Sequence, residues 1–127
     1  MPEVDVIDET FLAVPPATVA RAFTDPGAWR RFWPDLRLEV YADRGDEGLR
    51  WTVGGALVGT MEVWLEPVLD GTVLHYFLRA DLPAGTATRR GRLTREKTRR
   101  QLAAKAVALD LKALLEDGRR PGCPPGN

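Results

Sequence analysis

The chain has 127 residues, of which 44% are hydrophobic and 28% charged, and its formal net charge at pH 7 is zero. These values suit one globular domain and argue against disorder of the whole chain. No run approaches the roughly 20 apolar residues of a membrane-spanning helix, and the acidic first residues are unlike a secretory signal. The only cysteine, Cys123, cannot form an internal disulfide, so we expect a soluble, cytoplasmic protein.

The N-terminal third predicts one strand followed by two short helices. Residues 4–14 alternate in the manner of a strand, which Pro15-Pro16 ends because proline cannot donate a hydrogen bond to a neighbouring strand. Pro16 suits the first turn of a helix. Residues 25–27 form a turn in which Asp25 can cap a second short helix, and this helix must stop before Pro34.

The middle of the chain predicts four more strands joined by hairpins. Turns are expected at residues 43–48 and at Asp70-Gly71, and Gly54-Gly55 marks a bulge or tight bend that ends the second of these strands. Hairpin-linked strands form an antiparallel sheet with one buried and one wet face. The expected strands are 36–42, 49–53, 57–65 and 72–82.

The C-terminal part predicts one long helix that ends near residue 117 and is closed by Gly118. Gly91 leaves its start open, and Thr94 is a candidate N-cap. One apolar stripe follows the three- and four-residue steps of a helix and must be covered by the sheet: Ala104, Val107, Ala108, Leu111, Leu114 and Leu115. We therefore expect an α+β domain over residues 1–117, in which a curved antiparallel sheet of about five to six strands grips the long helix. Residues 118–127 should form a flexible tail rich in proline and glycine.

This order of elements resembles the SRPBCC superfamily, the helix-grip proteins that include START lipid carriers, birch-pollen-allergen-type proteins and bacterial polyketide cyclase/dehydrase-like proteins. Residues 25–34 (DPGAWRRFWP) are similar to the family's Asp-x-x-x-(Trp/Tyr)-x-x-(Phe/Trp)-x-Pro helix turn, and residues 14–19, 59–74 and 111–115 match other parts of the pattern. The resemblance implies a cavity for a lipid or polyketide-like compound between sheet and last helix. Usual members have six or seven strands, so a hairpin missing near Gly54-Gly55 implies a smaller cavity or one left open to a partner.

Nine side chains are candidates to line or overlook this cavity. An aromatic-rich pocket with few polar groups suits a small apolar ligand, although the same side chains could simply fill the core. The hydroxyl of Tyr76 could donate a hydrogen bond to a ligand carbonyl, and Arg100 could pair with an anionic ligand group or extend outward. The candidates are Trp29, Trp33, Trp51, Met61, Val63, Leu65, Tyr76, Leu78 and Arg100.

The usual catalytic motifs are absent from the sequence, which has no metal-binding Cys/His cluster, phosphate loop, nucleophile elbow or GxGxxG, so no cofactor or metal is expected. His75, the sole histidine, is better explained as a sheet-surface residue than as a general base, since no acidic or nucleophilic partner shares its strand. Binding of a small hydrophobic or aromatic ligand is the favoured function. The resemblance also permits a polyketide cyclase/dehydrase-type enzyme in which Tyr76 or Arg100 polarises a carbonyl.

A basic segment suggests a third function. Residues 89–105 hold eight cations against one anion, Glu96, so this segment could bind nucleic acid or an anionic membrane, or could form a solvated helix face. The chain's aromatic residues are not interleaved with these arginines, which disfavours nucleic acid.

An apolar patch predicts a homodimer. Five side chains share the strand parity that faces away from the long helix: Ile7, Phe11, Trp64, Val73 and Phe77. The first and last strands are neighbours in this fold type, so these side chains should merge into one exposed patch of the kind that usually marks an interface.

Overall fold

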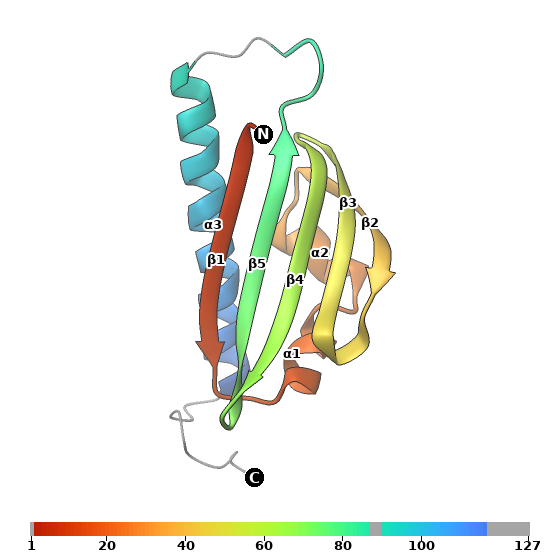
Figure 1. Ribbon diagram of the computed structural model, residues 1–127, viewed down its shortest axis with the longest axis vertical. Helices are drawn as coiled ribbons and strands as arrows, with labels where there is room; N and C mark the ends of the chain where they lie inside the picture. Colours follow the sequence, from red (N-terminus) through yellow and green to blue (C-terminus); the bar gives the residue numbers. More distant parts are fainter. Residues whose placement is uncertain (1, 87–89, 117–127) are drawn as a thin grey trace.

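The computed structural model describes residues 2–86 and 90–116 (Figure 1). Arg89 and the tail predicted for residues 118–127 lie outside the described residues. Among those residues, no helix combines the length and apolarity needed to cross a bilayer. The elements in chain order are β1 (Val4–Leu12), α1 (Pro16–Ala22), α2 (Pro26–Phe32), β2 (Leu36–Asp43), the 3-10 turn η1 (Gly45–Glu47), β3 (Gly48–Gly55), β4 (Val58–Val68), β5 (Gly71–Asp81) and α3 (Arg90–Glu116).

The five strands form one curved antiparallel sheet in the order β1-β5-β4-β3-β2. All three helices lie on one face of it (Figure 1), with α3 packed mainly against β1 and with α1 and α2 behind the other half of the sheet. This arrangement is a helix-grip fold. The predicted α+β class is confirmed, and the strand number is the lower of the two expected.

Strand alternation decides which side chains enter the core. Inward-facing positions such as Val6, Val63 and Leu78 are fully or almost fully buried, whereas their strand neighbours face the outer side of the sheet. The stripe of α3 supplies Ala104, Ala108 and Leu111 to the same core. It is narrower than predicted, because Leu114 lies at its edge and is 73% exposed.

Side chains of α3 cover the outer edge of β1. Gln101 Nε2 donates to the carbonyl of Ile7 (2.8 Å), Lys105 Nζ to that of Glu9 (3.1 Å) and Lys112 Nζ to that of Phe11 (2.9 Å). The acceptors are alternate residues of a strand edge that would otherwise offer unpaired carbonyls to another chain. The edge of β1 is therefore protected by the long helix itself.

Several predicted strand ends are wrong by two or three residues: β1 ends at Leu12 and not at residue 14, β3 at Gly55 and not at 53, and β4 at Val68 and not at 65. One predicted cap is wrong and one is confirmed. β3 continues through Gly54 and Gly55, because both residues pair with the first residues of β2, and the chain bends only at Gly55 (φ 92°). α3 begins at Arg90, so Thr94 lies inside the helix. Asp25 does cap α2, since its carboxylate accepts a hydrogen bond from the amide of Gly27 (2.9 Å).

Candidate functional site

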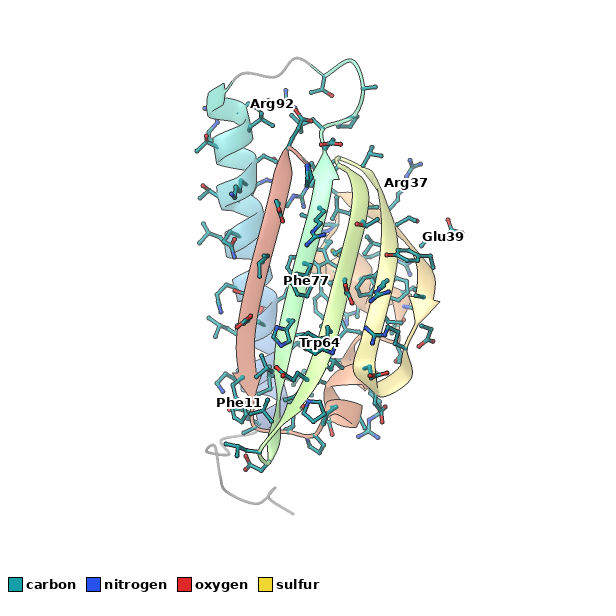
Figure 2. All side chains as sticks on the ribbon, viewed as in Figure 1. Phe11, Arg37, Glu39, Trp64, Phe77 and Arg92 are labelled. Atoms are coloured by element: carbon teal, nitrogen blue, oxygen red, sulfur yellow. The ribbon has the colours of Figure 1, made fainter. Side chains whose placement is uncertain are left out.

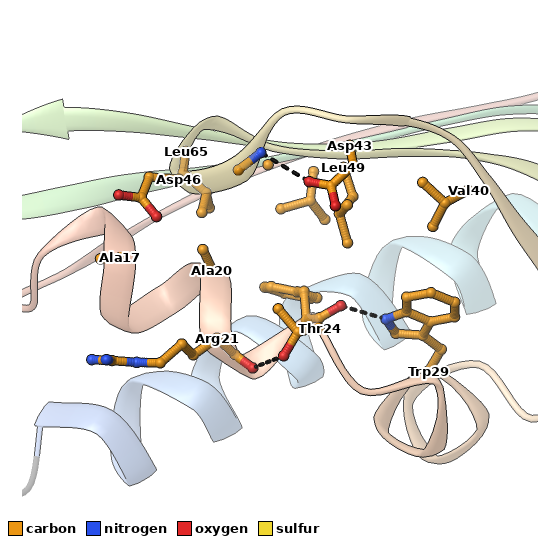
Figure 3. A pocket seen from close by; sticks show the side chains of 14 residues that line it. Ala17, Ala20, Arg21, Thr24, Trp29, Val40, Asp43, Asp46, Leu49 and Leu65 are labelled. Atoms are coloured by element: carbon orange, nitrogen blue, oxygen red, sulfur yellow. Dashed lines mark hydrogen bonds between the residues drawn. The ribbon is translucent and has the colours of Figure 1, made fainter.

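A pocket of about 350 Å³ lies between the sheet and the two short helices (Figure 3). Its walls are mostly apolar and come from α1 and α2 on one side and from β2, β3 and β4 on the other. The apolar lining is Ala17, Ala20, Phe23, Trp29, Val40, Leu49, Val63 and Leu65, and polar side chains join it at Arg21, Thr24, Asp43 and Asp46.

Trp29 is held in a fixed orientation at this pocket. Its Nε1–H donates to the carbonyl of Phe23 (2.7 Å), and its ring packs edge-on against Trp51 at a centroid distance of 5.5 Å. The indole therefore presents a ring to the pocket while its polar atom is already satisfied.

The polar lining also bonds within the protein. The Thr24 hydroxyl donates to the carbonyl of Arg21 (2.8 Å), and the Asp43 carboxylate accepts from the amide of Gly45 (2.9 Å). Among the described residues of this lining, no nucleophile is bonded to a base that could activate it. The arrangement is suited to holding an apolar molecule by shape.

The space beneath α3 is almost filled. A void of about 10 Å³, room for a single water molecule, remains beside Trp33, Tyr76 and Ala104. Trp33 stacks on Tyr76 with centroids 6.0 Å apart and meets Trp51 edge-on at 5.8 Å. These three large rings occupy the region in which sequence reasoning expected a cavity.

The structure separates the nine predicted cavity residues into four groups. Trp29, Val63 and Leu65 line the larger pocket, and Trp33 and Tyr76 line the small void, which Val63 also touches. Trp51, Met61 and Leu78 are at most 1% exposed in the core. Arg100 lines neither of these two spaces. Sequence reasoning missed Ala20, Phe23, Val40 and Leu49, although their strand and helix periodicity could have suggested inward faces.

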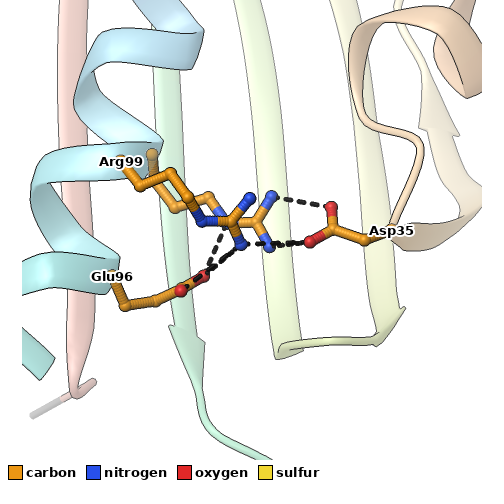
Figure 4. A network of polar contacts seen from close by, with 4 residues as sticks. Asp35, Glu96 and Arg99 are labelled. Atoms are coloured by element: carbon orange, nitrogen blue, oxygen red, sulfur yellow. Dashed lines mark hydrogen bonds and ion pairs between the residues drawn. The ribbon is translucent and has the colours of Figure 1, made fainter. Parts of the chain in front are cut away.

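Arg100 is 3% exposed and bonds to carboxylates of the protein itself (Figure 4). Its Nη1 and Nη2 atoms donate to the two Asp35 carboxylate oxygens at 2.9 and 2.7 Å, and its Nε donates to Glu96 at 2.9 Å. Arg99 contacts the same two acids from a more exposed position. This network ties α3 to the start of β2, and it competes with the predicted pairing of Arg100 with a ligand anion.

The network also sets the charge state of Asp35. Partial burial alone raises the pKa of the Asp35 carboxyl, but hydrogen bonds and positive charges from Arg100 and Arg99 outweigh it and hold that pKa below its ordinary value. The same contact with Asp35, opposed by burial, raises the pKa of the Arg99 guanidinium. Asp35 and Arg99 are therefore both ionised at neutral pH.

Tyr76 is a neutral hydrogen-bonding group. Burial raises the pKa of its hydroxyl well above the ordinary value, and the positive charge of Arg100 opposes this effect only in part. The phenol therefore keeps its proton and can act as a donor.

His75 lies on the outer face of the sheet, where it is buried between two acids. Its Nε2 is 2.9 Å from Glu66 Oε1, its Nδ1 is 3.4 Å from Glu9 Oε1, and its ring stacks on Trp64 at 4.3 Å. The acids come from the neighbouring strands β4 and β1, so a search along β5 alone missed them. Across the described residues, no group of three or more histidine, cysteine, aspartate or glutamate side chains could hold a metal ion.

Comparison with known proteins supports the fold. No family model matches the chain, and neither does any curated protein. The structure of DR_A0006 from Deinococcus radiodurans has a TM-score of 0.66 and 15% identity, covering 91% of this chain and 99% of that one. The Aha1 dimer from Colwellia psychrerythraea has a TM-score of 0.61 and 15% identity, covering 92% and 99%. Protein Ms6760 from Mycobacterium smegmatis has a TM-score of 0.63 and 15% identity, covering 89% and 91%. At these identities the likeness establishes the helix-grip fold alone.

Proposed function

We propose that this protein binds a small apolar or aromatic molecule in the pocket between α1, α2 and the sheet. The observation that carries the proposal is the apolar pocket of about 350 Å³ lined by rings and branched side chains such as Phe23, Trp29 and Val40. Small-molecule sites range over about 300–1,000 Å³, so the volume favours a ligand of one or two rings over a long lipid. The helix-grip fold and the sequence resemblance support membership of the SRPBCC superfamily, which we include in the proposal.

The two other functions considered have less support. Tyr76 and Arg100, the groups that a cyclase or dehydrase would use on a carbonyl, do not line the larger pocket. In the basic segment, Arg99 and Arg100 pair with Asp35 and Glu96, and Lys105 pairs with Asp8 at 3.0 Å. Three of the eight cations expected to attract nucleic acid or an anionic membrane are thus compensated inside the fold. A cytoplasmic location stays a prediction that rests on the single cysteine.

Filling the pocket from α1 tests the binding function. Ala20→Leu adds three carbon atoms to a side chain that lines the pocket, so it should weaken binding of 2-naphthol, measured by isothermal titration calorimetry, by about tenfold or more. Ala106→Leu, at an exposed position of α3, is the matched control and should bind 2-naphthol as the wild type does. No heat of binding in the wild type, or equal affinity in Ala20→Leu, would remove the support for this site.

We also propose that a second copy of the chain covers the outer face of the sheet. Trp64 and Phe77 lie on this face, away from the helices (Figure 2), and Ile7 beside Phe77 is 51% exposed. Phe11 lies at the end of β1, where the Lys112 ammonium of α3 is 5.7 Å from the centre of its ring. Apolar patches of this kind mark interfaces. Pairing through the edge of β1 is disfavoured because α3 covers that edge.

The charges of the outer face support self-association. The acids Glu9 and Glu66 lie beside His75, whereas the exposed Arg79 lies four residues further along β5. A copy related by a two-fold axis between these positions would place unlike charges together. The similar fold of Aha1 from Colwellia psychrerythraea has been solved as a dimer.

A charge placed in the patch tests the homodimer. Ile7→Lys should weaken dimerisation about tenfold or more in sedimentation velocity, because the lysine would be buried against apolar side chains. Leu109→Lys changes an equally exposed side chain on α3 (50% against 51%) and should leave the dimer intact. A wild-type chain that sediments as a monomer at high concentration would refute the homodimer.

A further inference from the structure

The larger pocket and the void beneath α3 share two walls. Phe23 and Val63 line both spaces. Phe23 is the residue that directly follows α1, is 3% exposed, and packs edge-on against Phe32 at 5.9 Å. Phe23 therefore borders both a pocket of about 350 Å³ and a void of about 10 Å³ beneath the long helix.

The inner side of this wall holds a buried donor without an acceptor. Trp33 is 2% exposed and lines the void, and its indole Nε1–H has no hydrogen-bond partner among the described residues. The indole Nε1–H of Trp51, in the same cluster of rings, is also buried and unpaired. Such groups are rare in native proteins, because a buried donor without an acceptor loses its hydrogen bonds to water and gains none in return.

The other polar groups at the void define the ligand that fits there. The Tyr76 hydroxyl is a neutral donor, like the Trp33 indole. The Asp8 carboxylate also lines the void, where it accepts from Thr10 Oγ1 and Lys105 Nζ, each at 3.0 Å. The described residues that line the void include no cation to pair with an anionic ligand group, whereas a neutral carbonyl oxygen can accept from the two uncharged donors.

We infer that the ligand is an aromatic molecule carrying a neutral carbonyl group, which reaches past Phe23 and accepts a hydrogen bond from Trp33 Nε1. The inference rests on the proposed binding function and adds the depth of the site and the polarity of its inner end. An apolar body stays in the larger pocket between Trp29 and Leu65, and the carbonyl occupies the place of a single water molecule.

Two probes of nearly equal shape test the inference on the wild-type protein. 2-Acetylnaphthalene carries a carbonyl where 2-ethylnaphthalene carries a methylene group, so calorimetry should show the ketone binding about five- to tenfold more tightly. In the ¹H–¹⁵N spectrum of the indole groups, the Trp33 resonance, assigned by its loss in Trp33→Phe, should move downfield with the ketone and stay in place with the hydrocarbon.

A pair of variants tests whether the ligand passes Phe23 to reach the void. Phe23→Leu should raise the apparent affinity for the ketone several-fold, because a smaller side chain increases the fraction of molecules in which the two spaces are joined. Phe32→Leu removes a ring from the same cluster but from neither lining, so its affinity should not rise.

The outcomes separate the inference from the function on which it rests. Equal binding of the two probes with an unmoved Trp33 resonance would overturn the inner site and leave the outer pocket standing. Failure of both probes to bind would overturn both.

Discussion

Replacing Gly48 with alanine should lower the free energy of unfolding by about 3 kcal/mol, the largest effect we expect from one small substitution. Gly48 begins β3 with φ 122°, a backbone conformation that residues other than glycine rarely adopt, and it lines the larger pocket. A Cβ atom placed there would overlap the carbonyl oxygen of Val63 on β4. Because that oxygen is backbone, the strands would have to separate at the wall of the pocket.

Gly45 provides the matched control three residues earlier. It also has a positive φ, 61°, but a Cβ atom there meets nothing within 4 Å. Gly45→Ala should therefore cost only the conformational strain, about 1 kcal/mol. Urea unfolding of both variants measures the difference. Equal losses in the free energy of unfolding would mean that the close approach of Gly48 to the Val63 carbonyl adds no cost to the substitution.

Asp35→Ala should lower the free energy of unfolding by about 2 kcal/mol, because it leaves the buried guanidinium of Arg100 with Glu96 as its remaining partner. The value is below that of a fully buried pair because the Asp35 side chain is 36% exposed. Arg99→Met removes the other cation from the same acid, but the Arg99 side chain is 55% exposed, so the loss should stay below about 1 kcal/mol.

The double variant Asp35→Ala/Arg100→Met tests whether Asp35→Ala is less stable because it leaves the buried Arg100 guanidinium without its Asp35 partner or because it removes side-chain packing. Removing the buried cation as well should recover part of the stability lost in Asp35→Ala. A double variant that is less stable than Asp35→Ala would show that Arg100 contributes mainly through packing of its side chain.

The same pair predicts a dependence on pH. Because the pKa of Asp35 is lower in the folded protein, its contribution is fully present above the value of about 3.9 in the unfolded chain and is lost as pH falls through the folded value. The stability difference between wild type and Asp35→Ala in urea should thus be constant near neutral pH and should shrink below about pH 4. A difference that grows on acidification would contradict the ion pair.

The fold was largely predictable from local patterns. Alternation in the strands, the apolar stripe around Ala104 and Ala108, and the turn at Asp70-Gly71 each report on neighbours in sequence, which is the range over which periodicity is reliable. The errors lay at the C-terminal ends of β1, β3 and β4 and at the candidate cap Thr94, which lies inside α3. At Gly54-Gly55, pairing with β2 outweighed the weak strand preference of glycine.

The site was less predictable because it depends on distances across the sheet. The stripe of α3 suggested a cavity beneath that helix, but Trp33 and Tyr76 are large enough to fill it, and the pocket remains where Ala20 and Gly48 are small. The pairing of His75 with Glu9 depends on the register of β1 and β5, and that of Arg100 with Asp35 joins residues 65 positions apart. Neither contact could therefore be predicted from the residues that are adjacent in sequence to His75 or Arg100.

A methyl map of wild-type protein titrated with 2-naphthol tests the binding site most directly. In ¹H–¹³C spectra, the largest shifts should fall on Ala20, Val40 and Leu65, which line the pocket, and methyl groups on the exposed side of α3, such as Leu102 and Leu109, should not move. Shifts confined to Ile7 and Val73 on the outer face, or no shifts at saturating probe, would contradict a ligand pocket between the short helices and the sheet.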